Sequence, residues 1–82
     1  MKTKDAIFAR MREILVEVFE VEERNITLEA HLYKDLDFDS LDAVELAVKL
    51  GVETGISLQE EELRAIRTIG DAVDIVHYRM NR

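Results

Sequence analysis

One stretch decides the fold of this 82-residue chain: Asp35-Leu36-Asp37-Phe38-Asp39-Ser40-Leu41-Asp42-Ala43-Val44-Glu45-Leu46-Ala47-Val48-Lys49-Leu50. Aspartate is favoured as a helix N-cap, and Asp39 is followed three residues later by Asp42, which puts a second carboxylate in the first turn, as in a capping box. We therefore predict a helix that begins at Ser40. A side chain at this position projects from a helix end whose free N–H groups and positive dipole favour an anionic substituent such as a phosphate.

This central helix has two apolar stripes on roughly opposite faces when each residue is rotated by about 100° from the last. The first stripe consists of Ala43, Leu46, Ala47 and Leu50. The second stripe consists of Leu41, Val44, Val48 and Val52. Because a helix in a small domain needs only one apolar stripe to pack on its core, the second is either additional core or a surface for a docking partner.

The residues around Ser40 resemble the prosthetic-group site of acyl carrier proteins. The resemblance rests on Asp39-Ser40-Leu41-Asp42 and Val44-Glu45-Leu46, with similar spacing over residues 26–36 and 66–69. In that family a serine bears a 4′-phosphopantetheine arm, whose terminal thiol carries acyl groups as thioesters. The resemblance implies that Ser40 is this serine and that Asp39 helps to position its modification. It also implies a magnesium-dependent phosphopantetheinyl transferase, which takes the arm from coenzyme A.

Composition and charge limit the classes of function. The chain is short enough for a single domain over residues 1–82, and it has no cysteine and a formal net charge of −7. Disulfides are therefore excluded, and the charge argues against nucleic acid and anionic membranes as partners. No apolar run is long enough for a membrane span. We expect a cytoplasmic monomer that meets basic protein surfaces.

Four helices and no strands are expected along the chain. The resemblance gives this all-α fold class its architecture, a small four-helix bundle of acyl-carrier type with three longer helices and a short third helix. The first helix is capped by Thr3 and has an apolar row of Ile7, Met11, Ile14, Leu15, Val18 and Phe19. The long loop over residues 20–38 needs anchors on the core, for which we predict Ile26, Leu28, Leu32 and Leu36.

The remaining helices follow from turn and cap residues. Gly55 marks the end of the central helix, and a short third helix is predicted from Gln59 to Ile66. Thr68 is placed to cap the last helix. The inward row of this last helix is predicted as Ile69, Val73, Val76 and Met80.

Two patterns suggest metal sites, but neither has a full set of ligands. Residues 35–39 begin like an EF-hand calcium loop, which would then need glycine at Ser40 and glutamate at Leu46. His31 and His77 have no cysteine and no second histidine at zinc-ligand spacing. We therefore expect no metal site.

Catalysis by the chain itself is not expected. Ser40 lies outside any Gly-x-Ser-x-Gly elbow, and the adjacent Asp39 and Asp42 make an alkoxide costly. The hydroxyl must therefore be activated by another protein. We expect a non-catalytic carrier without catalytic residues of its own.

The chain departs from the common pattern of fatty-acid carriers. Phe38 stands where the resemblance leads us to expect glycine, and residues 49–52 replace a glutamate-rich helix end. The acidic residues left for docking are Asp39, Asp42, Glu45 and Glu53. Two hypotheses therefore stay open: a carrier of fatty-acid biosynthesis and a specialised carrier of polyketide-like or lipid biosynthesis.

Two surfaces of the central helix are predicted to serve a carrier. The docking surface for acyl-transferring and chain-elongating or modifying enzymes comprises Leu41, Asp42, Val44, Glu45 and Val48. The acyl pocket comprises Leu46, Ala47, Leu50 and Ile66. Two alternatives stay open: a closed core in place of the pocket, and a non-carrier helical interaction module in which Leu41, Val44 and Val48 bind a partner.

Overall fold

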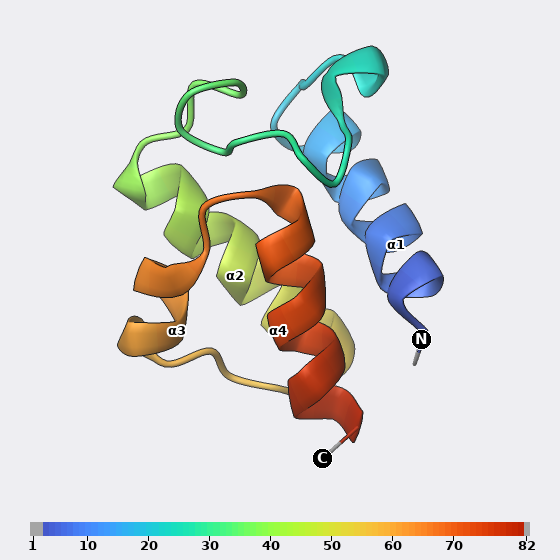
Figure 1. Cartoon of the computed structure of the whole chain (residues 1–82), viewed down its shortest axis with the longest axis vertical. Coiled ribbons are helices and arrows are strands. Elements are labelled where there is room, and N and C mark those ends of the chain that lie inside the picture. The colour runs from blue at the N-terminus through green and yellow to red at the C-terminus, as the bar shows by residue number, and fades with distance from the viewer. Residues whose placement is uncertain (1–2, 82) are drawn as a thin grey trace.

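Four α-helices surround the core in a computed structural model that describes residues 3–81 (Figure 1). They are α1 (Lys4–Glu17), α2 (Ser40–Thr54), α3 (Glu60–Ala65) and α4 (Ile69–Asn81). A 3₁₀ turn, Glu23–Asn25, lies in the long connection between α1 and α2. Within residues 3–81 there is no strand, only an isolated bridge between His31 and Thr68. The predicted all-α fold with one short third helix is confirmed.

Helices α1 and α4 form the most extensively packed pair (Figure 1). Each starts at a threonine cap, because Thr3 Oγ1 accepts the N–H of Ala6 at 3.1 Å and Thr68 Oγ1 accepts that of Asp71 at 3.0 Å. Their fully buried side chains are Ile7, Met11, Leu15, Ile69, Val73 and Val76. The predicted apolar row of α1 is wrong at Val18, which is exposed, whereas Phe19 next to it is partly buried against the core.

The start of α4 anchors the long loop through backbone hydrogen bonds. The N–H of Ile69 donates to the carbonyl of Ala30 at 3.0 Å, and the N–H of Gly70 donates to the carbonyl of Leu28 at 2.8 Å. A Cβ atom at Gly70 would lie 2.9 Å from that Leu28 oxygen, so glycine permits this close approach. The first-turn N–H groups of α4 thus find acceptors in the loop.

Side chains pin the same loop, though not all of those predicted. Ile26 and Leu32 are buried and Leu36 is partly buried against the core. The prediction for Leu28 is wrong, because its carbonyl faces α4 while its side chain is 45% exposed. Ala30 is buried instead.

The turn after α2 is tight. Gly55 adopts a left-handed conformation with φ of 77°, and its N–H donates to the carbonyl of Gly51 at 2.8 Å. A Cβ atom at Gly51 would lie 2.6 Å from the carbonyl oxygen of Ile56. The turn therefore needs glycine at residue 51 to bring residues 56–58 back along α2.

Substitution of Gly51 by alanine tests this close approach. Alanine gains about 1 kcal/mol of helix propensity, but the clash with backbone costs more, so we expect a net loss of about 1 kcal/mol or more in the free energy of unfolding. Urea unfolding followed by circular dichroism measures it. Val52→Ala, at the exposed neighbouring residue, is the matched control and should change stability by no more than about 0.5 kcal/mol. A more stable Gly51→Ala protein would contradict the contact.

Candidate functional site

Two aspartates fix the start of α2. Asp39 Oδ1 accepts the N–H of Asp42 at 2.9 Å, and Asp42 Oδ2 accepts the N–H of Asp39 at 3.1 Å. The predicted capping box is present, and Ser40 is the first helical residue. The Ser40 side chain is exposed. Its hydroxyl therefore stands at the positive end of a helix of 15 residues.

The segment before Ser40 is held against the end of α1. Phe38 is 8% exposed, its ring centroid lies 5.0 Å from that of Phe19, and its N–H donates to the carbonyl of Leu32 at 3.0 Å. The left-handed residue in this segment is Asp37, with φ of 58°. The conformation that favours glycine thus occurs one residue earlier than Phe38, where the resemblance had led us to expect it.

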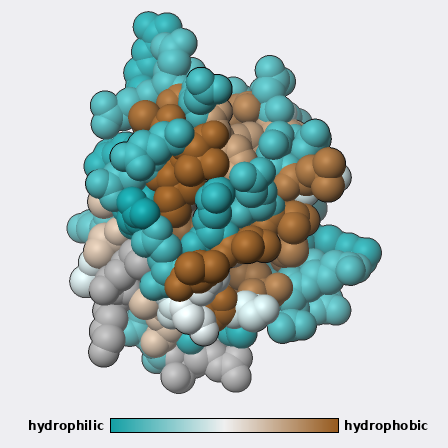
Figure 2. All heavy atoms as spheres, turned by 180° about the vertical axis from the view of Figure 1, so that it is seen from behind, coloured by the Kyte–Doolittle hydropathy of each residue, from teal (hydrophilic) through white to brown (hydrophobic). Residues whose placement is uncertain are grey.

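The second apolar stripe of α2 faces solvent. Leu41 is 77% exposed and Val52 81%, and Val44 and Val48 are also exposed. Figure 2 shows hydrophobic side chains gathered on one side of the molecule, bordered by hydrophilic ones. The second stripe therefore lies on the outer surface and is not additional core. An apolar row of this kind beside an exposed hydroxyl is typical of a binding site.

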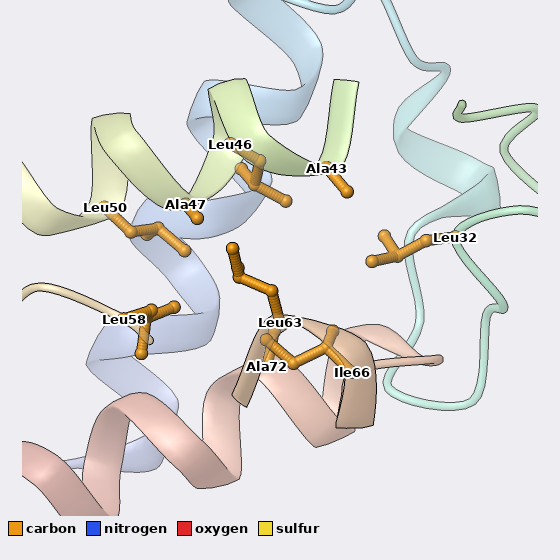
Figure 3. Close-up of a pocket in the computed structure, with 9 residues that line it drawn as sticks. All are labelled: Leu32, Ala43, Leu46, Ala47, Leu50, Leu58, Leu63, Ile66 and Ala72. Atoms are coloured by element: carbon orange, nitrogen blue, oxygen red, sulfur yellow. The ribbon is translucent and has the colours of Figure 1, made fainter. Parts of the chain in front are cut away.

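The first stripe of α2 lines a small cavity between α2, α3 and α4 (Figure 3). Leu46 and Leu50 are buried, and they meet Ile66 across the cavity with Ala47 beside them. Its volume of about 20 Å³ has room for about one water molecule. All four predicted pocket residues line this cavity, but in this conformation it is nearly closed.

Five further residues complete the cavity wall: Leu32, Ala43, Leu58, Leu63 and Ala72. In Figure 3, Leu63 points from α3 toward α2. The sequence offered a signal for Leu63, an apolar residue in a short polar helix. It offered none for Leu58, which stands alone in a connection without periodicity.

Neither suggested metal site gathers ligands in the structure. Among residues 3–81 no group of three or more His, Asp or Glu side chains is arranged to hold a metal ion. His31 instead stabilises its own loop, since its Nδ1 accepts hydrogen bonds from the N–H groups of Tyr33 and Lys34, each at 3.2 Å. No helix in the described part of the chain is long and apolar enough to cross a membrane.

Comparison with known proteins agrees with this geometry. The family described as "phosphopantetheine attachment site" matches residues 9–76. Acyl carrier protein 2 of Ralstonia nicotianae is 43% identical over 74 residues, covering 90% of this chain and 91% of that protein. The acyl carrier protein of Petrotoga mobilis is 38% identical over 79 residues, covering 96% and 93%. The chain belongs to the acyl carrier protein family.

The fold of a solved relative agrees as well. The structure of an acyl carrier protein from Enterococcus faecalis superimposes with a TM-score of 0.77 at 26% sequence identity, covering 93% of this chain and 96% of that one. As an acyl carrier protein, the chain is a non-catalytic carrier with covalently attached 4′-phosphopantetheine. Family membership favours the carrier over the plain interaction module.

The start of α2 fits such a prosthetic group. The phosphodiester of the arm is anionic, and the first-turn N–H groups of a helix have no intrahelical acceptors. The exposed hydroxyl of Ser40 can be reached from solvent, and the arm would extend beside exposed Leu41. The two capping carboxylates are held by hydrogen bonds to backbone N–H groups.

Glu53 does not belong to the acidic surface that the sequence suggested. Its carboxylate is bound by the guanidinium of Arg10 in α1, where Arg10 Nε donates to Glu53 Oε1 at 2.7 Å and Nη2 donates to Oε2. Arg10 also donates to Glu13 at 3.1 Å. The hydrogen bonds from Arg10 lower the pKa of Glu53, so this glutamate ties α2 to α1.

Replacement of Glu53 by glutamine should reduce stability in a pH-dependent way. Because the folded-state pKa of Glu53 is lowered, its contribution is complete above the ordinary glutamate pKa of about 4.3 and is lost as the pH falls through the folded-state value. The free energies of unfolding of wild type and Glu53→Gln should therefore differ at pH 7 and converge in acid.

Denaturant titrations across this pH range measure the difference. Glu17→Gln is the control, because Glu17 is an exposed glutamate of α1 that makes no ion pair within residues 3–81. A pH-independent gap between wild type and Glu53→Gln would contradict the assignment.

Proposed function

We propose that Ser40 carries the 4′-phosphopantetheine arm and that the protein passes acyl thioesters between partner enzymes. The capping box of Asp39 and Asp42 carries this proposal, since it leaves the Ser40 hydroxyl exposed at the first position of α2. The chain has one other serine, Ser57, which lies in the connection between α2 and α3 without a helix of its own.

Loading of the arm requires a second protein. The carboxylates of Asp39 and Asp42 disfavour an alkoxide on Ser40, so its hydroxyl needs a base from a magnesium-dependent phosphopantetheinyl transferase. Asp39 uses Oδ1 for the cap, which leaves Oδ2 to position the transfer from coenzyme A. The use of coenzyme A and of acyl-processing enzymes supports a cytoplasmic location.

Partner enzymes are proposed to dock on the exposed face of α2. Leu41, Val44 and Val48 supply the apolar centre, and Asp42 and Glu45 supply negative charge beside it. Basic partner surfaces would be steered toward Ser40 by these carboxylates, so salt should slow association. The partners are acyl-transferring and chain-elongating or modifying enzymes.

The cavity beneath α2 is proposed to store the cargo. Its walls, including Leu46, Ala47, Leu50 and Ile66, are apolar and suit a hydrocarbon chain. Burial of each methylene is worth about 0.8 kcal/mol, which can offset the parting of the helices that a medium chain requires. This supports fatty-acid or related lipid biosynthesis over cargo with many polar groups.

The modification of Ser40 is tested by intact-mass spectrometry after co-expression with a broad-specificity transferase. Wild type should gain the mass of one phosphopantetheine group, and Ser40→Ala should gain none. Ser57→Ala removes the other serine and should be loaded like wild type. A loaded Ser40→Ala protein would refute the assignment.

The docking face is tested by charge introduced on either side of α2. Val44→Asp should change the free energy of unfolding by only about 0.5 kcal/mol, because it opens no core cavity. It should lower kcat/KM of loading about tenfold, the effect of removing an interfacial contact worth about 1.4 kcal/mol.

Leu46→Asp is the matched change on the buried side. It places an unpaired charge in the core and should destabilise the domain by about 3 kcal/mol or more. Circular dichroism and a loading assay measure both variants. A folded Val44→Asp protein that is loaded at the wild-type rate would remove Val44 from the docking surface.

A further inference from the structure

A thin partition separates the inner cavity from an outer groove. The groove has a volume of about 400 Å³ and runs along the exposed side of α2, where its walls include Val44 and Val48. Cavity and groove share three wall residues, Ala47, Leu58 and Leu63. Ala47 belongs to α2, so the part of the partition that lies outside this helix consists of Leu58 and Leu63.

Arg79 of α4 binds the residues that directly precede the partition. Its Nη1 donates to Glu62 Oε1, and its Nη2 donates to the carbonyl oxygen of Ser57 at 3.2 Å. Glu62 also accepts the N–H of Gln59 at 2.8 Å, which caps α3. The side chains of Arg79 and Glu62 are only 21% and 25% exposed. The planar guanidinium thus fixes residues 57 and 62 at the same time.

Helix α3 depends on such contacts for its position. It has six residues, none of them buried, and is far shorter than a helix that is stable alone. Leu63 holds it to α2 and the buried Ile66 holds its end. Loss of the Arg79 contacts would weaken the attachment of α3 to α4.

We propose that Arg79 is a positioning residue that governs the entry of cargo into the cavity. The guanidinium keeps Leu58 and Leu63 closed over the cavity, and a hydrocarbon chain enters from the groove by parting them. Entry then disturbs the contacts of Arg79 with Glu62 and Ser57, and this cost selects for chains long enough to offset it by burial. The inference rests on the proposed storage of cargo beneath α2.

The test compares the thermal stability of acetyl and octanoyl forms of the loaded protein. The octanoyl form should have a higher Tm than the acetyl form. In wild type this difference is reduced, because entry of the octanoyl chain breaks the contacts of Arg79. In Arg79→Gln those contacts are already absent, so the gain should be larger by about 4 °C although the starting Tm is lower. Arg79→Lys keeps the charge with a single ammonium and should fall between the two.

The matched control is Arg64→Gln in α3. Arg64 also pairs with a glutamate, Glu60, at 2.6 Å, but this pair is exposed and lies within α3. Its octanoyl gain should equal that of wild type. An Arg79→Gln gain equal to or smaller than that of wild type would overturn the proposal, as would an equal increase in Arg64→Gln.

Other outcomes separate this inference from the proposed function. A wild-type protein that takes up no arm would refute the attachment site. A loaded wild type without an octanoyl gain would refute both cargo storage and the role of Arg79. If Arg79→Gln does not fold, the test uses Arg79→Lys instead. In that variant, hydrogen exchange of the Leu63 amide should be faster than in wild type. Unchanged exchange and an unchanged octanoyl gain in Arg79→Lys would overturn the proposal.

Discussion

The reciprocal hydrogen bonds of Asp39 and Asp42 determine where α2 begins, and the candidate site depends on that start. With the cap at Asp39, the N–H groups of the first turn lie beside Ser40. A start one residue later would turn Ser40 into the cap and direct its oxygen to a backbone N–H instead of solvent. The capping box therefore keeps the serine hydroxyl available for chemistry.

The position of this cap is set by the loop that precedes it. Hydrogen bonds from the first turn of α4 hold the backbone near Leu28 and Ala30. Packing of Phe38 on Phe19 then brings the end of the loop back to α1. A loop of this length without strands is ordered because both its backbone and its side chains are anchored.

Local chemistry explains why much of α2 could be predicted from the sequence. A cap and its partner are three residues apart, and a stripe recurs every three or four residues, so Asp39, Ser40 and both apolar faces were readable. The second stripe was predicted to lie on the surface, but periodicity alone left additional core open as the alternative, because burial depends on where α1 and α4 lie. In the structure, Leu46 and Leu50 of the first stripe are buried and Leu41 of the second stripe is exposed.

The wrong predictions for Leu28 and Glu53 share a cause in contacts between distant residues. Leu28 looked like an anchor, but its backbone carbonyl makes the contact with α4 and its side chain faces outward. Glu53 looked like part of an acidic surface until Arg10, 43 residues earlier, proved to bind it. A repeating sequence pattern gives no information about contacts between residues that lie far apart in the chain. The contact of Arg79 with Glu62 and Ser57 was hidden for the same reason.

The sites proposed for cargo and for partner enzymes lie on opposite sides of one layer of side chains. The exposed stripe that we propose for docking forms one wall of the groove, and the cavity lies directly behind Leu58 and Leu63. A partner seated against Val44 and Val48 would therefore adjoin the partition proposed to cover the cargo. Coupling between docking and release would need no long path through the domain, because it would require movement only of Leu58 and of the short helix α3, the least buried of the four helices.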